Sequence, residues 1–462
     1  MKRLLFIFLL LSLSNCDDDS STQNNNNNNI QEVPVRTDCA VTIEYPAGSE
    51  NGAKVVGSFN DWSIESGVVL LRDGYRWLGR LTSNAHENGA ASVLPPGEHH
   101  YKIVLNDTDW FNDSGNPYSI FDESQQNENS LLILPDCDTP YLEELQTDVQ
   151  FAQGSLSLAV QVFRAGDGEQ IQNVELLVFK GEELVDAQLD YNEHSGMAVA
   201  TGTGLSHGKY RFSFTATDVM GRMFHRTFPV WFEQESLNWE DMTLYSIFVD
   251  RFFSGDSSND APIDGLDPQV NWQGGDWRGI TQKLRDGYFD SLGITALWLS
   301  TPMDNPDYSL PGDCEQSFSG YHAYWPQAAR EVENHFGTTD DLKELVAEAH
   351  SRGIRVLVDW AANHIFIDHP LHIEHEGNPF WFNYPGSTNP DEFWKNKCGI
   401  LGWNEYALTC WFTEYLPDYN HRNQELVHGL IEDAMWWVET FDLDGFRVDA
   451  TKHIRSNYLR LL

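Results

Sequence analysis

Arg447 and Asp449 are the residue types that nucleophilic catalysis by a carboxylate needs. They are separated by one residue in the stretch Gly-Phe-Arg-Val-Asp, which starts at Gly445. Residues two apart on a β-strand point to the same face, so the guanidinium would lie beside the carboxylate. A neighbouring positive charge favours the ionised form of a carboxyl group, as a nucleophile requires. The same pair is also common as a structural salt bridge, and the spacing alone leaves both interpretations open.

Enzymes that cleave glycosidic bonds with retention of configuration use such a carboxylate as one of two catalytic groups. The other is a protonated carboxyl group, about 5 to 5.5 Å from the nucleophile. The elements around Arg447 and Asp449 therefore decide what the pair can do.

Beyond Trp239 the sequence alternates apolar strands with helical segments, which indicates a parallel α/β sheet. Strands are predicted at 244–249, 294–299, 355–358 and 446–448. A helix is predicted at 340–352, with Thr338 or Thr339 as its cap and Gly353 at its end. Repeated units of this kind predict a (β/α)8 barrel, whose active sites lie at the C-terminal ends of the strands.

Motifs at these strand ends resemble those of glycoside hydrolase family 13, the α-amylase family. The three main ones are Val-Leu-Val-Asp359 continuing to Asn363-His364, Leu-Pro-Asp418-Tyr-Asn420, and the stretch from Gly445 to His453. Further matches are Phe-Val-Asp-Arg-Phe at 248–252, Gly-Gly-Asp-Trp at 274–277, Gly-Tyr-His-Ala-Tyr-Trp-Pro at 320–326 and Phe-Gly-Thr at 336–338. The resemblance implies a TIM-barrel catalytic domain over 239–462, with an inserted loop domain at about 369–415.

The resemblance also implies roles for single residues. Asp449 resembles the catalytic nucleophile and Arg447 its partner. The positions expected to bind substrate are His322, Tyr324, Asp359, His364, Lys452 and His453. Among these, Tyr324 resembles an aromatic platform, His364 a hydrogen-bond donor, and Lys452 and His453 the leaving-group side.

The implied activity is retaining hydrolysis of α-1,4-glucosidic bonds in starch-like glucans. The alternatives are a cyclodextrin-forming or neopullulanase-like transglycosylase or hydrolase, and a non-catalytic glucan-binding lipoprotein. No residue of this sequence matches the family's general-acid Glu or the Asp that follows the seventh strand. We therefore expect an N-terminal fragment of a longer enzyme, or a decayed product, and no release of reducing sugar from starch by these 462 residues alone.

Calcium is implied at two places. The first resembles the family's site between the barrel and its inserted loop, with the oxygen donors Asn363, Asp418 and the His453 carbonyl, as Ca²⁺ prefers. The second resembles a site of cyclodextrin-forming relatives and comprises Asp256, Asn259, Asp260, Gly274 and Asp276. Ser254 replaces an Asp expected there, and solvated turns are the alternative explanation.

Two β-rich segments precede the barrel region. Motifs in 38–138 resemble a family 48 carbohydrate-binding module on a β-sandwich, with Trp62, Trp77, Lys102 and Trp110 as candidate sugar-binding residues. An exposed indole offers a flat apolar face to a glucose ring, whereas buried tryptophans would only fill the sandwich core. Segment 149–233 predicts an immunoglobulin-like sandwich with no evident chemistry.

The first 37 residues predict export. Met1-Lys-Arg precedes an apolar run from Leu4 to Leu13, which is typical of a signal peptide, and residues 13–16 resemble a lipoprotein cleavage box ending at Cys16. Asn15 departs from that box, so plain secretion is the alternative to a lipid-anchored envelope protein. Residues 17–37 predict a disordered tether.

Export permits disulfides, and we expect Cys39 to pair with Cys137 and Cys398 with Cys410. A buried reduced thiol is the alternative.

The formal charge of −41 disfavours nucleic acid as a partner, because an acidic protein repels the phosphate backbone and does not release its counterions. The expected partner is an α-glucan, and the oligomeric state cannot be predicted.

Overall fold

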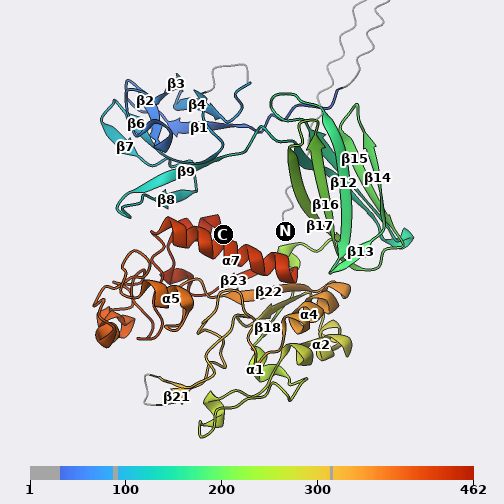
Figure 1. Ribbon diagram of the computed structural model, residues 1–462, viewed down its shortest axis with the longest axis vertical. Helices are drawn as coiled ribbons and strands as arrows, with labels where there is room; N and C mark the ends of the chain where they lie inside the picture. Colours follow the sequence, from blue (N-terminus) through green and yellow to red (C-terminus); the bar gives the residue numbers. More distant parts are fainter. Residues whose placement is uncertain (1–31, 87–91, 313–315) are drawn as a thin grey trace, which may run out of the picture.

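The computed structural model describes residues 32–86, 92–312 and 316–462. Figure 1 shows two β-rich lobes above an α/β lobe, with helix α7 beneath both β-rich lobes. The signal peptide, Cys16, most of the tether and Cys314 lie outside the described residues. None of the helices in the described part is long and apolar enough to cross a membrane.

The tether prediction is wrong for residues 33–36. Val33 and Arg36 are buried, and Val35 forms a bridge with Arg164 at the edge of the second lobe. Arg36 also donates to the Asp136 carbonyl oxygen at 2.7 Å. Buried Val33 and the hydrogen bonds of Arg36 therefore hold this short segment between the two β-rich lobes.

The first lobe is a nine-stranded sheet in the order β1-β4-β3-β2-β6-β9-β8, with β5 beside β4 and β7 beside β6. Its strands are β1 (Ala40–Pro46), β2 (Ala53–Gly57), β3 (Val68–Asp73), β4 (Arg76–Thr82), β5 (Ser92–Val93), β6 (Gly97–Leu105), β7 (Asp109–Phe111), β8 (Ser119–Phe121) and β9 (Glu128–Leu134). Ile43 of β1 and Leu81 of β4 share one core with Val55 of β2 and Ile103 of β6, so the sheet folds over on itself. The predicted Cys39–Cys137 disulfide is present and links the residue before β1 to the segment after β9.

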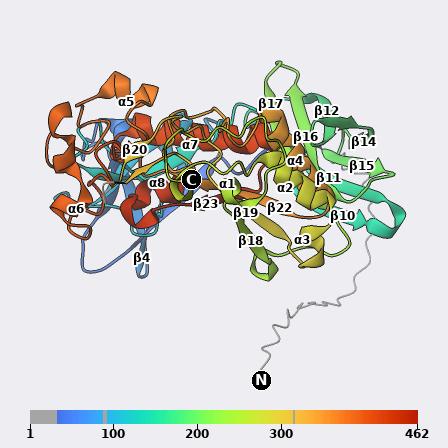
Figure 2. The same ribbon diagram turned by 90° about the horizontal axis from the view of Figure 1, so that it is seen from below.

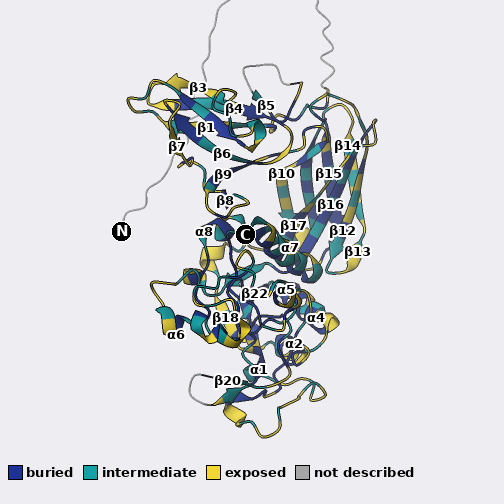
Figure 3. Cartoon of the chain, turned by 60° about the vertical axis from the view of Figure 1, so that its left-hand side comes forward, coloured by how far each residue is buried: buried dark blue, intermediate teal, exposed yellow. Residues whose placement is uncertain are grey.

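The second lobe is an antiparallel sandwich of two four-stranded sheets, in the orders β10-β11-β15-β14 and β13-β12-β16-β17. The strands are β10 (Tyr141–Gln150), β11 (Ser155–Phe163), β12 (Ile171–Lys180), β13 (Glu183–Val185), β14 (Ala187–Asn192), β15 (Met197–Thr203), β16 (Gly208–Asp218) and β17 (Met223–Phe232). Burial alternates along β11 and β16, as expected for strands with one face in a core (Figure 3). The sandwich begins at Tyr141, earlier than the predicted residue 149.

The α/β lobe contains four parallel strands in the order β18-β19-β22-β23. They are β18 (Leu244–Ile247), β19 (Ala296–Leu299), β22 (Arg355–Trp360) and β23 (Gly445–Val448), close to the predicted ranges. The helices outside the inserted domain are α1 (Val249–Phe252), α2 (Trp277–Arg285), α3 (Tyr288–Ser291), α4 (Thr339–Ser351), α7 (Gln424–Phe441) and α8 (Ser456–Leu461). A short hairpin pairs β20 (Leu310–Pro311) with β21 (Ser317–Phe318). Thr338 caps α4 in a capping box with Asp341, so the predicted helix is confirmed.

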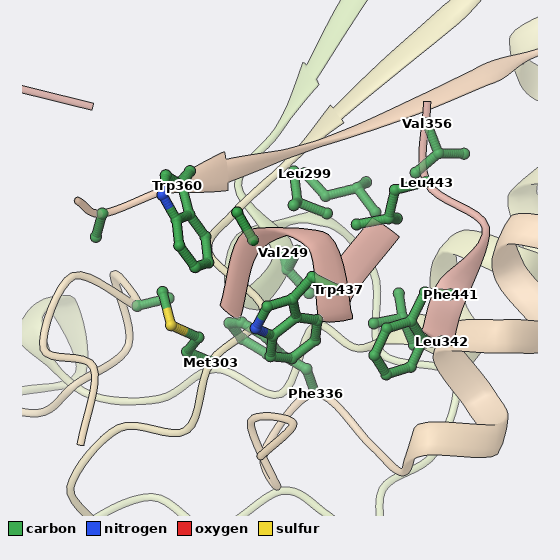
Figure 4. Packing of buried hydrophobic residues seen from close by; sticks show 14 of the residues in the cluster. Val249, Leu299, Met303, Phe336, Leu342, Val356, Trp360, Trp437, Phe441 and Leu443 are labelled. Atoms are coloured by element: carbon green, nitrogen blue, oxygen red, sulfur yellow. The ribbon is translucent and has the colours of Figure 1, made fainter. Parts of the chain in front are cut away.

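The core of this lobe lies between the sheet and its helices. Trp437 and Phe441 of α7 stack at 5.0 Å and lie beside Leu342 of α4 and Phe336 (Figure 4). Val356 and Val358 of β22 are buried in the same cluster. This packing fixes the strands whose ends carry the candidate site.

The inserted segment after β22 is a small folded unit at the opposite end of the molecule from the second sandwich (Figure 2). It contains α5 (Pro370–His375) and α6 (Cys398–Leu401), and the predicted Cys398–Cys410 disulfide is present. Phe382 and Trp411 are buried there, whereas Trp394 and Trp403 are each 48% exposed. Burial therefore separates the core aromatic residues of the insertion from those that face solvent.

Charged pairs hold the second sandwich against the α/β lobe. Arg355 of β22 donates to both oxygens of Glu233 at 2.8 and 2.9 Å and lies over the Trp231 ring at 3.7 Å. Lys209 of β16 donates to Asp444 at 2.9 Å, immediately before β23. These groups are buried, so the pairs are shielded from solvent screening.

Candidate active site

Arg447 lies at the centre of a polar chain at the C-terminal ends of β22 and β23. Asp359 and Arg447 are directly paired in the register of these strands. The Arg447 guanidinium donates to Asp449 Oδ1 at 2.5 Å and to Asp359 at 2.9 and 3.2 Å. Burial disfavours its charged form, but the hydrogen bonds to the two carboxylates outweigh burial and raise the pKa of Arg447. A permanently charged guanidinium therefore adjoins Asp449, whose side chain is 23% exposed.

Asp359 positions both Arg447 and Tyr324. It accepts from Arg447 and, at 2.6 Å, from the Tyr324 hydroxyl, while burial raises its pKa against the effect of these bonds. Its side chain is only 2% exposed. The prediction that Asp359 itself binds substrate is therefore corrected, since its oxygens are occupied by protein donors.

Tyr324 and His322 lie side by side, as expected for a platform at the site. Their rings are stacked at 6.0 Å with planes 17° apart, and the Tyr324 backbone N–H donates to His322 Nδ1 at 3.0 Å. Ala323 between them has φ +65°, in the left-handed region, which is uncommon for a residue other than glycine. Burial lowers the pKa of His322 to about 4, so its ring is neutral at pH 7.

His364 supports the Tyr324 platform through a hydrogen bond to its backbone. Its Nε2 bonds the Tyr324 carbonyl oxygen at 3.0 Å, and its side chain is buried. Burial also lowers the pKa of His364, which keeps it neutral. The structure thus shows His364 bonded to protein, rather than at the open position expected of a sugar donor.

Lys452 and His453 lie against the inserted domain. Lys452 Nζ donates to Asn404 Oδ1 at 2.8 Å. The His453 ring lies 5.8 Å from Trp403 and 4.9 Å from Phe412. Asn404 and Phe412 were missed by the sequence analysis, because nothing but the aromatic richness of the insertion indicated which of its residues turn toward β23.

The first predicted calcium set contains unpaired oxygens. Asn363 Oδ1 and Asp418 Oδ1 are both buried and have no hydrogen-bond donor. The other Asp418 oxygen accepts from Asn383 at 2.8 Å, and burial raises the Asp418 pKa well above its ordinary value. A buried carboxylate with a free oxygen beside a free amide oxygen is a donor set that suits a hard cation. Asn363 and Asp418 therefore fit a Ca²⁺ ion.

The second predicted set fits calcium less well. Asp276 caps α2, and its oxygens accept from the backbone N–H groups of Gly255, Asp256 and Gly279. Asp256 is paired with Arg278. These two assignments as metal ligands are corrected, because a cap and a salt bridge already use their oxygens.

The remaining residues of the second set are Asn259, Asp260 and Gly274. Asp260 lies directly against Gly274, since a Cβ on Gly274 would meet Asp260 Oδ1 at 1.9 Å, and Asn259 Oδ1 is buried without a donor. Three of the five predicted ligands thus remain uncommitted, which is too few to define a cage by themselves.

Three of the four candidates in the first lobe meet at one hollow of about 390 Å³. Trp62, Lys102 and Trp110 line it, together with Asp122, Asn127 and Asn129. The Trp62 and Trp110 rings are 6.4 Å apart with planes 40° apart. Asp61 and Trp62 both have left-handed backbones, a strained arrangement that often accompanies a binding site.

Trp77 is the exception among those candidates. It is 5% exposed and belongs to the core of the first lobe with Leu81, four residues later on β4. Its predicted role in sugar binding is wrong, because a buried indole has no free face for a glucose ring.

Comparison with known proteins gives the following matches. A family model described as alpha amylase, catalytic domain, matches residues 246–460. A cyclomaltodextrin glucanotransferase of Klebsiella oxytoca is 29% identical over 238 residues, which are 49% of this chain and 35% of that protein. Alpha-amylase mde5 of Schizosaccharomyces pombe is 34% identical over 224 residues, 48% of this chain and 40% of that protein. The chain therefore spans well under half the length of these two curated relatives.

Among solved structures, the alpha-amylase of Geobacillus thermoleovorans in complex with acarbose is 30% identical to this chain. The match covers 49% of this chain and 44% of that one, with a TM-score of 0.37.

Proposed function

We propose that the chain is the nucleophile-bearing part of a retaining glycoside hydrolase of the α-amylase family, whose catalytic-domain model matches residues 246–460. The proposed reaction is hydrolysis of α-1,4-glucosidic bonds in starch-like glucans. The observation that carries it is the linked set Asp449, Arg447, Asp359 and Tyr324, in which one partly exposed carboxylate adjoins a charged guanidinium.

In the proposed mechanism Asp449 attacks the anomeric carbon of the sugar bound at Tyr324, the glycosidic C–O bond breaks, and the leaving oxygen takes a proton from the general acid. Water then attacks the same carbon, which frees Asp449 and releases the sugar. Arg447 donates to the attacking carboxylate and holds it in position. Asp359 orients both Arg447 and the Tyr324 hydroxyl. Asp359 accepts three hydrogen bonds, so it does not serve as the proton donor to the leaving group. Lys452 and His453 are proposed on the leaving-group side, next to the exposed Trp403.

We propose that the four-stranded sheet is the first half of a (β/α)8 barrel. Both outer strands, β18 and β23, pair with one neighbour only among the described residues, and a barrel leaves no such edges. The general acid would come from a later strand. We use the term extended enzyme for these 462 residues followed by the remaining strands of the catalytic domain.

Ca²⁺ is the proposed cofactor, held by Asn363 and Asp418 with the His453 carbonyl as a third donor. When bound, its positive charge would offset the cost of burying the ionised Asp418 carboxylate. Asn363 precedes His364, and Asp418 bridges to His364 through the backbone, so an ion held by these two residues would brace the Tyr324 platform.

A transferase acting on the same glucans is the second candidate. Several similar relatives are cyclomaltodextrin glucanotransferases, and Trp403 and Phe412 could bind a sugar acceptor in place of water.

For the first lobe we propose a carbohydrate-binding module of the family 48 type, whose site is Trp62, Lys102 and Trp110. For the N-terminal residues we propose export, with Cys16 as a lipid anchor at the cell envelope.

The product anomer tests the proposed function. The extended enzyme, incubated with maltoheptaose, should release products that are initially α-anomers, because two inversions restore the configuration. Proton NMR within the first minutes distinguishes α from β before mutarotation. Cyclic products in the same reaction would favour the transferase, whereas initial β-products or no cleavage would refute the assignment to a retaining enzyme.

A further inference from the structure

A large hollow lies outside the catalytic region, where the first lobe meets the α/β lobe. It measures about 1040 Å³, and we call it the junction groove. Its walls come from the turn between β8 and β9, the inserted domain, and the start of α7 (Figure 1). Ligand pockets are usually about 300–1,000 Å³, so the junction groove could hold an extended ligand.

The walls of the junction groove are fixed to each other by side-chain amides, of which Gln125 and Asn420 are buried. Gln125 donates to the Phe380 carbonyl oxygen at 3.0 Å and accepts from Asn420 at 2.8 Å. Gln424 of α7 donates to the Phe121 carbonyl oxygen. A groove whose two sides are locked in this way needs little further ordering when a ligand binds.

The lining favours a neutral ligand that carries many hydroxyl groups. Five carboxylates face two arginines, Arg330 and Arg422, so an anion would be repelled. The amides of Asn378 and Asn423 can both donate and accept. Phe380 is 51% exposed, and Trp381 next to it is held flat against His375 at 3.8 Å. Aromatic faces among amides and carboxylates suit the apolar faces and hydroxyls of glucose units.

The junction groove adjoins the hollow of the carbohydrate-binding module. Asp122 lines both. At its other side, Gln125, Phe380 and Arg422 also line a third hollow of about 380 Å³ that reaches Tyr384 and Thr409 of the inserted domain. The three hollows therefore adjoin one another between Trp110 and the inserted domain.

We propose that the junction groove is a second α-glucan site, continuous with the module site, which binds the part of a longer glucan that extends beyond Trp62 and Trp110. The inference rests on the proposed function of the module. It assigns Phe380 as an aromatic contact, and it makes binding dependent on glucan length.

Calorimetric titration of the 462-residue chain with maltotriose and maltoheptaose tests the inference. Phe380→Ala should weaken maltoheptaose binding roughly fivefold, the size of one aromatic contact, and leave maltotriose binding unchanged. Trp394→Ala is the matched control, because Trp394 is an exposed aromatic residue of the inserted domain that lines none of the three hollows. Trp110→Ala should weaken both sugars.

The outcomes separate the two proposals. If Trp110→Ala weakens both sugars while Phe380→Ala changes neither, the module site stands and the junction groove is no glucan site. If Trp110→Ala leaves maltotriose binding intact, the module proposal fails. Hydrogen exchange gives a second readout that needs no variant: maltoheptaose, and not maltotriose, should protect residues 376–382. Equal protection by the two sugars would overturn the inference.

Discussion

Asp449→Asn is expected to lower starch hydrolysis by the extended enzyme by on the order of 10⁴-fold or more, since it removes the proposed nucleophile of a covalent mechanism. The amide is isosteric with the carboxylate, and it can still accept from Arg447, which donates to Asp449 Oδ1 at 2.5 Å. Binding of starch should therefore stay near normal. Initial rates of reducing-sugar release and a starch-binding assay measure the two effects separately.

Asp290→Asn is the matched control for this variant. Asp290 is a partly exposed carboxylate paired with Arg352, away from the strand ends that carry the site. Its replacement should leave the rate within about twofold, as surface substitutions far from a site have small effects. An Asp449→Asn enzyme of normal activity would remove Asp449 from the mechanism altogether.

Chelation of calcium is expected to lower the melting temperature by roughly 5–10 °C, if the ion is otherwise present at about a hundred times its Kd. The reason is the pair of buried oxygens on Asn363 and Asp418, which have no other donor in the described structure. Differential scanning calorimetry with and without a chelator, followed by added CaCl2, measures the shift and its reversal.

Two variants test whether that shift arises at the proposed ligands. Asp418→Asn should abolish the calcium-dependent shift, because an amide oxygen replaces the only charged ligand. Asp433→Asn should preserve it, since Asp433 lies on α7 and pairs with Arg330 instead. A calcium shift that survives in Asp418→Asn would place the ion elsewhere, for example among Asn259, Asp260 and Gly274.

The strands and the positions of Arg447 and Asp449 were predictable because their signals are local. Apolar runs that end in polar residues mark β22 and β23, and the register of these strands then brings Asp359 opposite Arg447. Thr338 and Asp341 likewise mark the start of α4 through short-range hydrogen bonds. Such features depend on residues close in sequence, which is why pattern and spacing were sufficient.

The errors arose where long-range contacts decide. Trp77 and Trp110 are the same residue type on strands of one lobe, yet only Trp77 faces the core. Asp276 has the position of a metal ligand, but the fold uses it to cap α2. The contact between Gln125 and Phe380 joins residues 255 positions apart, and no local pattern indicates it. Tertiary packing assigns these side chains, and a single sequence does not carry that information.

Covalent trapping tests the central claim most directly. The extended enzyme would be incubated with a fluorinated α-glucosyl fluoride, which forms the glycosyl-enzyme intermediate faster than water can release it. Peptide mass spectrometry then locates the sugar. If Asp449 is the nucleophile, one fluoroglucosyl group will be found on the peptide that contains residues 445–453, attached to Asp449; a sugar attached to any other residue would contradict this role.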